Sequence, residues 1–267
     1  MRKSLYYLLF LILFFGCGQD PTTETITVND GQSDEILNIL FQSMKNFEAQ
    51  DFYEEGATPY TGNTAGGKPI WGFFEKNVSN ALKASDRGVQ LIVPKDLAGM
   101  NNIGAKGKTS WTSTDIYNLA QGYGSSSTSD KGVLKVFFLK GVFANSEGNQ
   151  PGVLGVQLSN TMVVAIFKDN IEAIRSSQGL TVARFSEQAV LIHEFGHALG
   201  LVNNGITPQS DHHDSSHGSH CTQKSCVMYY LNEGSTDLGE FIRNYILTGD
   251  EDLFGNQCLQ DLHSKIQ

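Results

Sequence analysis

The chain of 267 residues is long enough to bury a sizeable core, and its composition, 40% hydrophobic and 18% charged, is that of a globular protein. With 28 acidic and 19 basic residues, it has a formal net charge of -9 and no basic stretch that could neutralise phosphates. These values exclude a chain that is disordered throughout and a nucleic-acid partner.

The first 20 residues, MRKSLYYLLFLILFFGCGQD, have the order of features found in a secretory signal. Two basic residues precede an apolar run, 5–15, that is too short to span a bilayer comfortably. The run ends in FFGC, which resembles the lipobox of bacterial lipoproteins. Residues 1–16 are therefore predicted to be a signal peptide, with Cys17 lipidated as the first residue of the mature protein. An ordinary signal peptide with an incidental cysteine is the alternative.

Export has consequences for the rest of the chain. The polar residues 17–32 are expected to form a tether to the folded domain. In bacterial lipoproteins an aspartate directly after the lipidated cysteine favours retention in the inner membrane. Because this position holds Gly18, the protein is expected at the outer membrane, on its periplasmic or surface face. The remaining thiols, Cys221, Cys226 and Cys258, would meet oxidising conditions. Because three is an odd number, at most one internal disulfide forms, and one thiol stays free, pairs with another chain or binds a metal.

Hydrophobic periodicity predicts alternating helices and strands in the first two thirds of the chain. A helix capped by Ser33 would place Ile36, Leu40, Met44 and Phe47 on one face. The further predicted elements are helices at 68–85 and 114–120, a loop at 121–132, strands at 89–93, 133–144, 152–159 and 161–169, and C-terminal helices at 237–249 and 253–266. Together they predict one α/β (α+β) domain at 33–267.

The segment HEFGHALG, residues 193–200, carries the strongest chemical signal in the chain. A helix capped by Ser186 would place His193 and His197 on one face, where both imidazoles can hold a zinc ion. Glu194 is turned aside and can act as general base on a water whose pKa the zinc lowers to about 7. That arrangement suits peptide hydrolysis. Since the pattern is short, two unrelated histidines on a helix are the alternative.

Gly200 would end this helix where the chain must turn beneath the metal, because glycine tolerates the left-handed conformation. The pattern H-E-x-x-H-x-x-G resembles the metzincin metallopeptidases, in which a third histidine ligand follows three residues after the glycine. Here that position holds Asn203, a weak ligand for zinc. The third ligand must therefore come from elsewhere in the chain.

A displaced third ligand is offered by HCTQKSCVM, residues 220–228. A histidine followed by Cys-x4-Cys-x-Met resembles the archaemetzincin branch of the metzincins, which implies that His220 is the third ligand and Met228 forms the turn beneath the metal. An insertion that begins with the turn signal Asn204-Gly205 would separate the two halves of the pattern. The other competent ligands in the inserted loop are His217, which is the second choice, and His212, His213 and Asp214.

The resemblance also assigns roles around this turn. Tyr230 stands two residues after Met228, a spacing similar to that of astacin- and serralysin-like metzincins, and is a candidate donor to the oxyanion. A buried aromatic beside the turn is the alternative. Archaemetzincins carry a further Cys-x2-Cys that completes a second zinc site, whereas this chain offers only Cys258 there. Because of this departure from the archaemetzincin pattern, one catalytic Zn²⁺ is expected, and in an exported protein a Cys221–Cys226 disulfide that pins the turn is favoured over a second zinc site.

The resemblance to metzincins implies a twisted mixed sheet with an antiparallel edge strand, an active-site helix, a Met-turn and C-terminal helices. The strand at 152–160 would bind an extended substrate by strand addition. The predicted function is a membrane-anchored zinc endopeptidase, with Glu194 as general base, that acts on a protein or peptide substrate outside the cytoplasm. The alternative is a non-catalytic lipoprotein that binds zinc or a protein partner.

Overall fold

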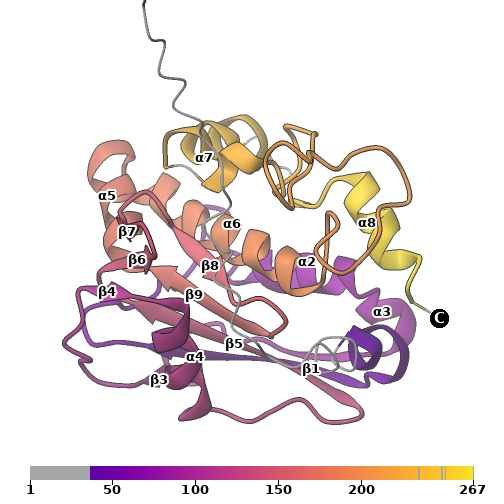
Figure 1. Cartoon of the computed structure of the whole chain (residues 1–267), viewed down its shortest axis with the longest axis horizontal. Coiled ribbons are helices and arrows are strands. Elements are labelled where there is room, and N and C mark those ends of the chain that lie inside the picture. The colour runs from indigo at the N-terminus through magenta and orange to yellow at the C-terminus, as the bar shows by residue number, and fades with distance from the viewer. Residues whose placement is uncertain (1–36, 234, 248, 250, 267) are drawn as a thin grey trace, which may run out of the picture.

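The structure is a computed structural model and describes residues 37–233, 235–247, 249 and 251–266 (Figure 1). The predicted signal peptide, Cys17 and the tether lie outside these residues. The described chain folds into a twisted mixed sheet with helices on both faces, so the predicted α/β class is confirmed.

The central sheet of the described residues has six strands, in the order β2-β1-β5-β9-β8, and β3 also pairs with β1. These strands are β1 (Asn46–Tyr53), β2 (Gln90–Ile92), β3 (Asn101–Asn102), β5 (Lys131–Leu139), β8 (Gly155–Gln157) and β9 (Val163–Phe167). All pairs are parallel except β8 with β9, which makes β8 an antiparallel edge strand. A small second sheet contains β4 (Ser110–Trp111), β6 (Val142–Asn145) and β7 (Gly148–Gln150).

Hydrophobic side chains cover both faces of the central sheet. β5 and β9 are mostly buried and so lack the polar alternation of a half-exposed strand. One face packs against α2 (Gly72–Ala81) and α6 (Leu180–Ala198), and the other against α4 (Ser113–Gln121). The remaining helices are η1 (Ile39–Ser43), α3 (Ala84–Arg87), η2 (Leu97–Gly99), α5 (Lys168–Gln178), η3 (Tyr230–Glu233), α7 (Ser235–Phe241), η4 (Ile242–Ile246) and α8 (Asn256–His263). Among the described helices, none is both long and apolar enough to cross a membrane.

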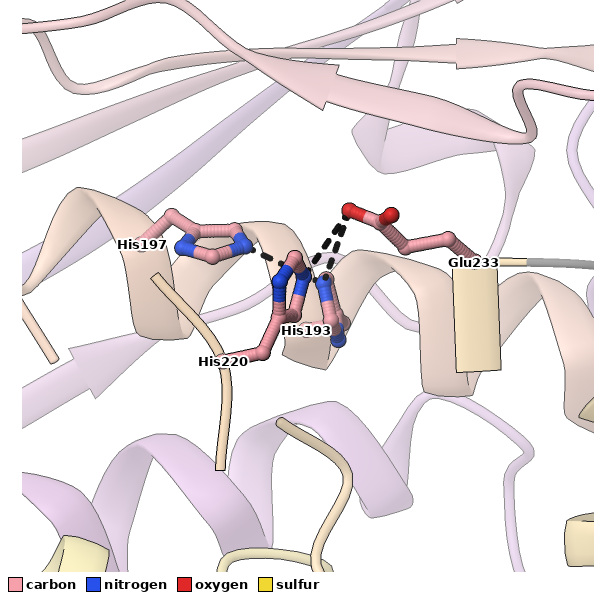
Figure 2. A group of neighbouring side chains, drawn as sticks. All are labelled: His193, His197, His220 and Glu233. Atoms are coloured by element: carbon pink, nitrogen blue, oxygen red, sulfur yellow. Dashed lines mark hydrogen bonds and ion pairs between the residues drawn. The ribbon is translucent and has the colours of Figure 1, made fainter. Parts of the chain in front are cut away.

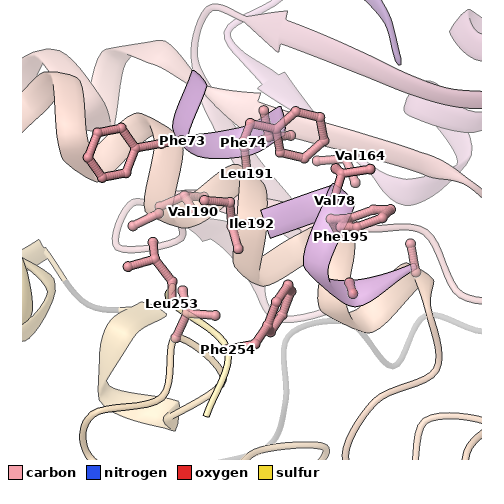
Figure 3. Close-up of a cluster of buried hydrophobic side chains, with 14 of the residues drawn as sticks. Phe73, Phe74, Val78, Val164, Val190, Leu191, Ile192, Phe195, Leu253 and Phe254 are labelled. Atoms are coloured by element: carbon pink, nitrogen blue, oxygen red, sulfur yellow. The ribbon is translucent and has the colours of Figure 1, made fainter. Parts of the chain in front are cut away.

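From Ser186 to its end, the long helix α6 is buried on all sides, and this holds it in the middle of the molecule. Leu191 and Phe195 are wholly buried among side chains of α2, the sheet and the C-terminal segment that contains Phe254 (Figure 3). Glu187, one of its two acidic residues, is also wholly buried and forms an ion pair with Lys168 at the start of α5. Sliding or rotating this helix would expose apolar area and separate a buried ion pair, both of which are costly. The direction of the side chains at 193–197 is therefore fixed.

Three predicted element boundaries are wrong because tertiary contacts override local periodicity. Phe47, expected on an N-terminal helix, lies in β1, whose backbone pairs with the parallel strands β2 and β5 while the Phe47 ring packs against Phe195 of α6. The predicted strand at 133–144 breaks at Gly141, whose φ of 83° turns the chain from β5 into β6. Ser186 does not cap α6: the helix begins at Leu180, and Ser186 is buried inside it.

Gly196 on α6 allows the loop that carries Met228 to approach the helix closely. A Cβ at this position would collide with the Met228 sulfur and lie 2.9 Å from Phe254 Cε1. Gly196→Ala is therefore expected to lower the free energy of unfolding by about 1–3 kcal/mol, as overpacking does, despite the better helix propensity of alanine. Denaturant unfolding measures the loss. Gly72→Ala is the control, because nothing lies within 4 Å of the added methyl group. Equal stability of both variants would show that the approach of Met228 is not tight.

Candidate metal centre

Three histidine side chains converge beside α6 (Figure 2). His193 and His197 lie one helical turn apart, with their Nε2 atoms at 3.1 Å. His220 comes from the loop after the helix, and its ring centroid lies 5.3 Å from each of the other two. The structure thus brings together the three side chains that were predicted as ligands. Their role as ligands stays a prediction.

Backbone carbonyls orient two of these rings. His193 Nδ1 lies 2.7 Å from the Val227 carbonyl oxygen, and His220 Nδ1 is hydrogen-bonded to the carbonyl oxygen of His217. Because a carbonyl oxygen only accepts, each Nδ1 carries the proton, and in the neutral ring Nε2 has a lone pair that points into the group. Hydrogen bonds of this kind are typical of histidines that bind metals.

The histidine group is buried, and burial favours the neutral imidazole. The exposed fraction is 3% for His193, 6% for His197 and 1% for His220. Burial, together with charge on the two neighbouring imidazoles, holds the pKa of His197 well below its ordinary value. Since a metal ion binds the neutral form, the environment prepares this ring as a ligand.

The chain leaves α6 before the loop brings His220 back. Gly200 has a φ of 82°, and the Asn204 side-chain amide donates to the His197 carbonyl at 3.0 Å. Asn203, at the position where metzincins have the third histidine, is exposed and has a φ of 68°. The chain therefore turns at the position where the metzincin-like pattern would have its third ligand, and the residues that follow form a folded loop that leads to His220.

Glu233 joins the histidine group, although the sequence analysis did not select it. It ends η3, and its Oε1 lies 3.0 Å from His220 Nε2 and 3.7 Å from His193 Nε2. All four ligand atoms lie within 4.8 Å of one another. Burial raises the pKa of Glu233, but hydrogen bonds and charge attraction from the two imidazoles, when these are protonated, outweigh burial and hold it well below its usual value. The sequence carries one weak signal for this residue, since no other acidic residue lies between Cys221 and Asp237.

The other predicted residues of this region surround the group. Met228 is wholly buried against Gly196. Tyr230 stacks on the ring of His217, with centroids 3.6 Å apart and planes at 7°. Its role as an oxyanion donor stays a prediction. His217, the second choice as third ligand, also pairs with Asp214 at 2.8 Å and lies in the loop instead of the histidine group.

A second group of potential ligands involves the residue that follows His220. The sulfurs of Cys221 and Cys258 and Nδ1 of His212 lie within 4.8 Å of one another, and the Cys226 sulfur is 3.6 Å from that of Cys258. All four side chains are wholly buried. Asp261 of α8 lies 2.7 Å from His212 Nε2, and so turns Nδ1 toward the sulfurs. Three thiolates and one imidazole are a ligand set of structural zinc sites.

The expected Cys221–Cys226 disulfide is corrected by the structure, because all three cysteines of the described residues are free thiols. Backbone N–H groups donate to the sulfurs of Cys221 and Cys226. Hydrogen bonds from the thiols of Cys226 and Cys258 lower the pKa of Cys221. These contacts stabilise a thiolate, as metal binding requires. Spacing along the chain could not reveal that Cys258 and His212 meet the other two cysteines.

Two pockets flank the histidine group. One, of about 400 Å³, lies beside His193 and Glu194 and is also lined by Glu233. The other, of about 310 Å³, lies beside His197 and is lined by Gln157 of β8. Both pockets are lined by residues of α6 and of the segment around β8, so each forms a cleft between the helix and the edge strand.

The edge strand β8 approaches α6 closely. A Cβ at Gly155 would lie 2.6 Å from Val190 Cγ1 and 3.1 Å from Glu194 Cγ, so the glycine is needed for this approach. Leu154 and Leu158 form backbone hydrogen bonds with the β9 side. In an antiparallel pair the alternate residues, here Gly155 and Gln157, direct their N–H and C=O groups to the open edge.

No protein-family model matches this chain, and no curated protein matches it. Among solved structures, the chain is similar to an archaemetzincin from Methanopyrus kandleri, with 14% sequence identity and a TM-score of 0.45. The alignment covers 84% of this chain and 95% of that chain. At this identity and TM-score, the similarity assigns neither a family nor an activity.

His220 and His212 are expected to serve different metal ions. With cobalt(II) as the probe, His220→Ala should weaken binding at the histidine group at least about 10-fold and leave the thiolate-to-cobalt absorption unchanged. His212→Ala should reduce that absorption and leave the histidine group intact. Chelator titrations followed by absorption measure both sites, with His217→Ala as the control. The opposite pattern, loss of the histidine site in His212→Ala alone, would show that the ligand assignment is wrong.

Proposed function

We propose that this protein is a zinc-dependent endopeptidase. The observation that carries the proposal is the position of Glu194, which follows His193 of a potential metal group on α6 and lines, with His193 and Glu233, a pocket beside the edge strand β8. Three buried imidazoles and one carboxylate are ligands that zinc prefers. The metzincin-like pattern of residues 193–200 and 220–228 supports the same reaction.

The residues of the histidine group would hold zinc through Nε2 of His193, His197 and His220. Zinc bound there would supply the charge that lowers the pKa of a water and polarises a peptide carbonyl. The Val227 and His217 carbonyls keep two of the rings in the tautomer that this role needs. The ligand rings are thus already oriented for metal binding before the metal arrives.

Glu194 would move the proton. It follows His193 on α6, so its side chain leaves the helix in a different direction from the ligand nitrogens. It is buried in the pocket that Gly155 and Val190 also line. From this position its carboxylate can take a proton from water and return it to the departing amine, whose place is the same cleft.

An extended peptide would bind along β8. The outward N–H and C=O groups of Gly155 and Gln157 can pair with the main chain of a substrate, as in other cases of strand addition. Main-chain pairing gives affinity with little dependence on sequence. The two pockets beside His193 and His197 would then receive side chains on either side of the scissile bond.

Glu194→Gln tests this mechanism. The variant should retain zinc but lose about 10²- to 10⁴-fold in the rate of cleavage of a quenched casein substrate, because the amide cannot accept a proton. Glu240→Gln, at an exposed position of α7, is the matched control and should cut normally. Zinc content is measured on all three proteins. Normal cleavage by Glu194→Gln would refute the assigned role of this carboxylate.

A non-catalytic zinc-binding or partner-binding protein is the second candidate. It is favoured by Glu233, because a metal centre with four protein ligands is usually structural. The same assay separates the two candidates. A zinc-loaded wild-type protein that cuts no protein or peptide substrate would favour the second candidate.

We further propose that the protein is exported and anchored to the bacterial outer membrane, on its periplasmic or surface face, by lipid on Cys17. The proposal rests on the apolar run 5–15 and the FFGC motif. Expressed in a bacterium, the full chain should partition with membranes, and Cys17→Ala should remain unprocessed or enter the soluble exported fraction. Equal partitioning of both proteins into the soluble fraction would favour an ordinary signal peptide.

A further inference from the structure

The carboxylate of Glu233 lies where a fourth metal ligand would lie. Tetrahedral ligands bound to zinc at 2.0–2.2 Å stand about 3.3–3.6 Å from one another. The observed separations are 3.1 Å between the Nε2 atoms of His193 and His197, 3.0 Å from Glu233 Oε1 to His220 Nε2, and 3.7 Å to His193 Nε2 (Figure 2). Glu233 Oε1 therefore lies about as far from His193 and His220 as a fourth ligand of a tetrahedral site would, and all four ligand atoms lie within 4.8 Å of one another.

These atoms require a cation between them. The Nδ1 atoms of His193 and His220 donate to backbone carbonyls, so in the neutral rings both Nε2 atoms are electron-pair donors. A carboxylate oxygen is also an electron-pair donor, and two such atoms at hydrogen-bond distance repel each other. The contact between Glu233 and the histidines becomes favourable when a proton or a metal ion lies between them.

A metal ion satisfies the whole group at once, whereas protons do not. The three ring centroids are 4.8, 5.3 and 5.3 Å apart, so charging more than one imidazole places like charges side by side in a buried site. One divalent cation supplies the same positive charge at a single point and contacts all four ligand atoms. The geometry is thus that of a four-ligand metal site.

A buried amide holds η3 next to the ligands. Asn232 is buried, and its side chain donates to the carbonyl oxygens of Cys226 at 3.1 Å and Val227 at 3.2 Å. The Val227 oxygen also accepts from His193 Nδ1. One backbone carbonyl therefore positions both His193 and the residue before Glu233, which ties the carboxylate to the metal group through the fold.

Glu233 is the ligand that can be replaced from outside. Its side chain is 32% exposed, whereas the three histidines are at most 6% exposed. It lines the pocket that contains Gly155 and Glu194, where a substrate carbonyl would have to arrive. An entering group can reach the carboxylate without disturbing α6.

We propose that Glu233 is a fourth, displaceable metal ligand that keeps the centre closed until a peptide bound along β8 takes its place. The inference rests on the proposed zinc peptidase function and describes the resting form of the same site. A catalytic zinc needs an open position, whereas four protein ligands leave none. Displacement exchanges one oxygen ligand for another, and the released carboxylate turns to solvent as an anion.

The test uses the full chain loaded with cobalt(II) and acetohydroxamate as the probe for an open position. Glu233→Ala should bind cobalt at least about 10-fold more weakly in chelator competition, since a ligand is lost. It should bind acetohydroxamate at least about 10-fold more tightly than the wild type. If the wild-type site is open in only one molecule in ten, its apparent affinity is 10-fold lower than that of a site that is always open. Glu233→Gln, which preserves the shape of the side chain, should change both values in the same direction.

Glu240→Gln is the control, and thermal unfolding shows whether each variant is folded. Equal acetohydroxamate affinity in the wild type and both Glu233 variants would overturn the proposal, even if cobalt affinity falls, since Glu233 would then only support a neighbouring histidine. If the wild type binds no cobalt at the histidine group, the inference and the proposed function both fail. If the Glu233 variants behave as expected but zinc-loaded protein cuts no substrate, the inference stands and only the peptidase proposal fails.

Discussion

Electron-pair donors from four side chains meet beside α6, and such a meeting is stable only around positive charge. Each buried polar group without a partner costs about 1–3 kcal/mol, which is a large part of the stability of a domain. The backbone carbonyls of His217 and Val227 accept the Nδ1 protons of His220 and His193. The Nε2 lone pairs of both rings therefore point toward the other ligand atoms and repel them. A cation between the four ligand atoms would offset this repulsion. The turn beneath α6, the loop that carries His220 and the edge strand β8 all lie around that position.

The inserted loop connects this point to the second ligand group. His220 and Cys221 are neighbours in the chain but belong to different groups, so neither group can form without placing the other. Lengthening a loop about fourfold costs only about 1 kcal/mol of closure entropy. Two hydrogen bonds to Asp261 offset that cost, one from the backbone N–H of Gln209 and one from His212 Nε2, both at 2.7 Å. A third ligand far from the helix is therefore compatible with a stable centre.

The sequence predicts features that depend on local geometry. His193, Glu194, His197 and Gly200 follow from the pitch of one helix and the way it ends, and the mixed sheet follows from the alternation of apolar runs. Contacts between segments that are distant in the sequence cannot be predicted in this way. Hydrophobic periodicity shows which face of an element is apolar, but it does not show which other element packs against that face. Glu233 and His212 reach their groups through such contacts, and so does Cys258. The same limit explains why the helix predicted from Ser33 extends to Phe47, although β1 begins at Asn46.

Glu194 and Glu233 are two carboxylates with opposite demands on one site. Glu194, as general base, can act only when a water is bound at the metal, whereas Glu233, as fourth ligand, occupies the place of that water. Activity therefore depends on the free-energy difference between the closed and the open forms of the site. A tenfold preference for the closed form corresponds to about 1.4 kcal/mol. A single hydrogen bond contributes about 0.5–1.5 kcal/mol, and β8 offers outward groups at both Gly155 and Gln157. Strand addition by a peptide can therefore supply enough free energy to shift the centre from the closed to the open form. A site of this kind opens for the substrates that fill the cleft.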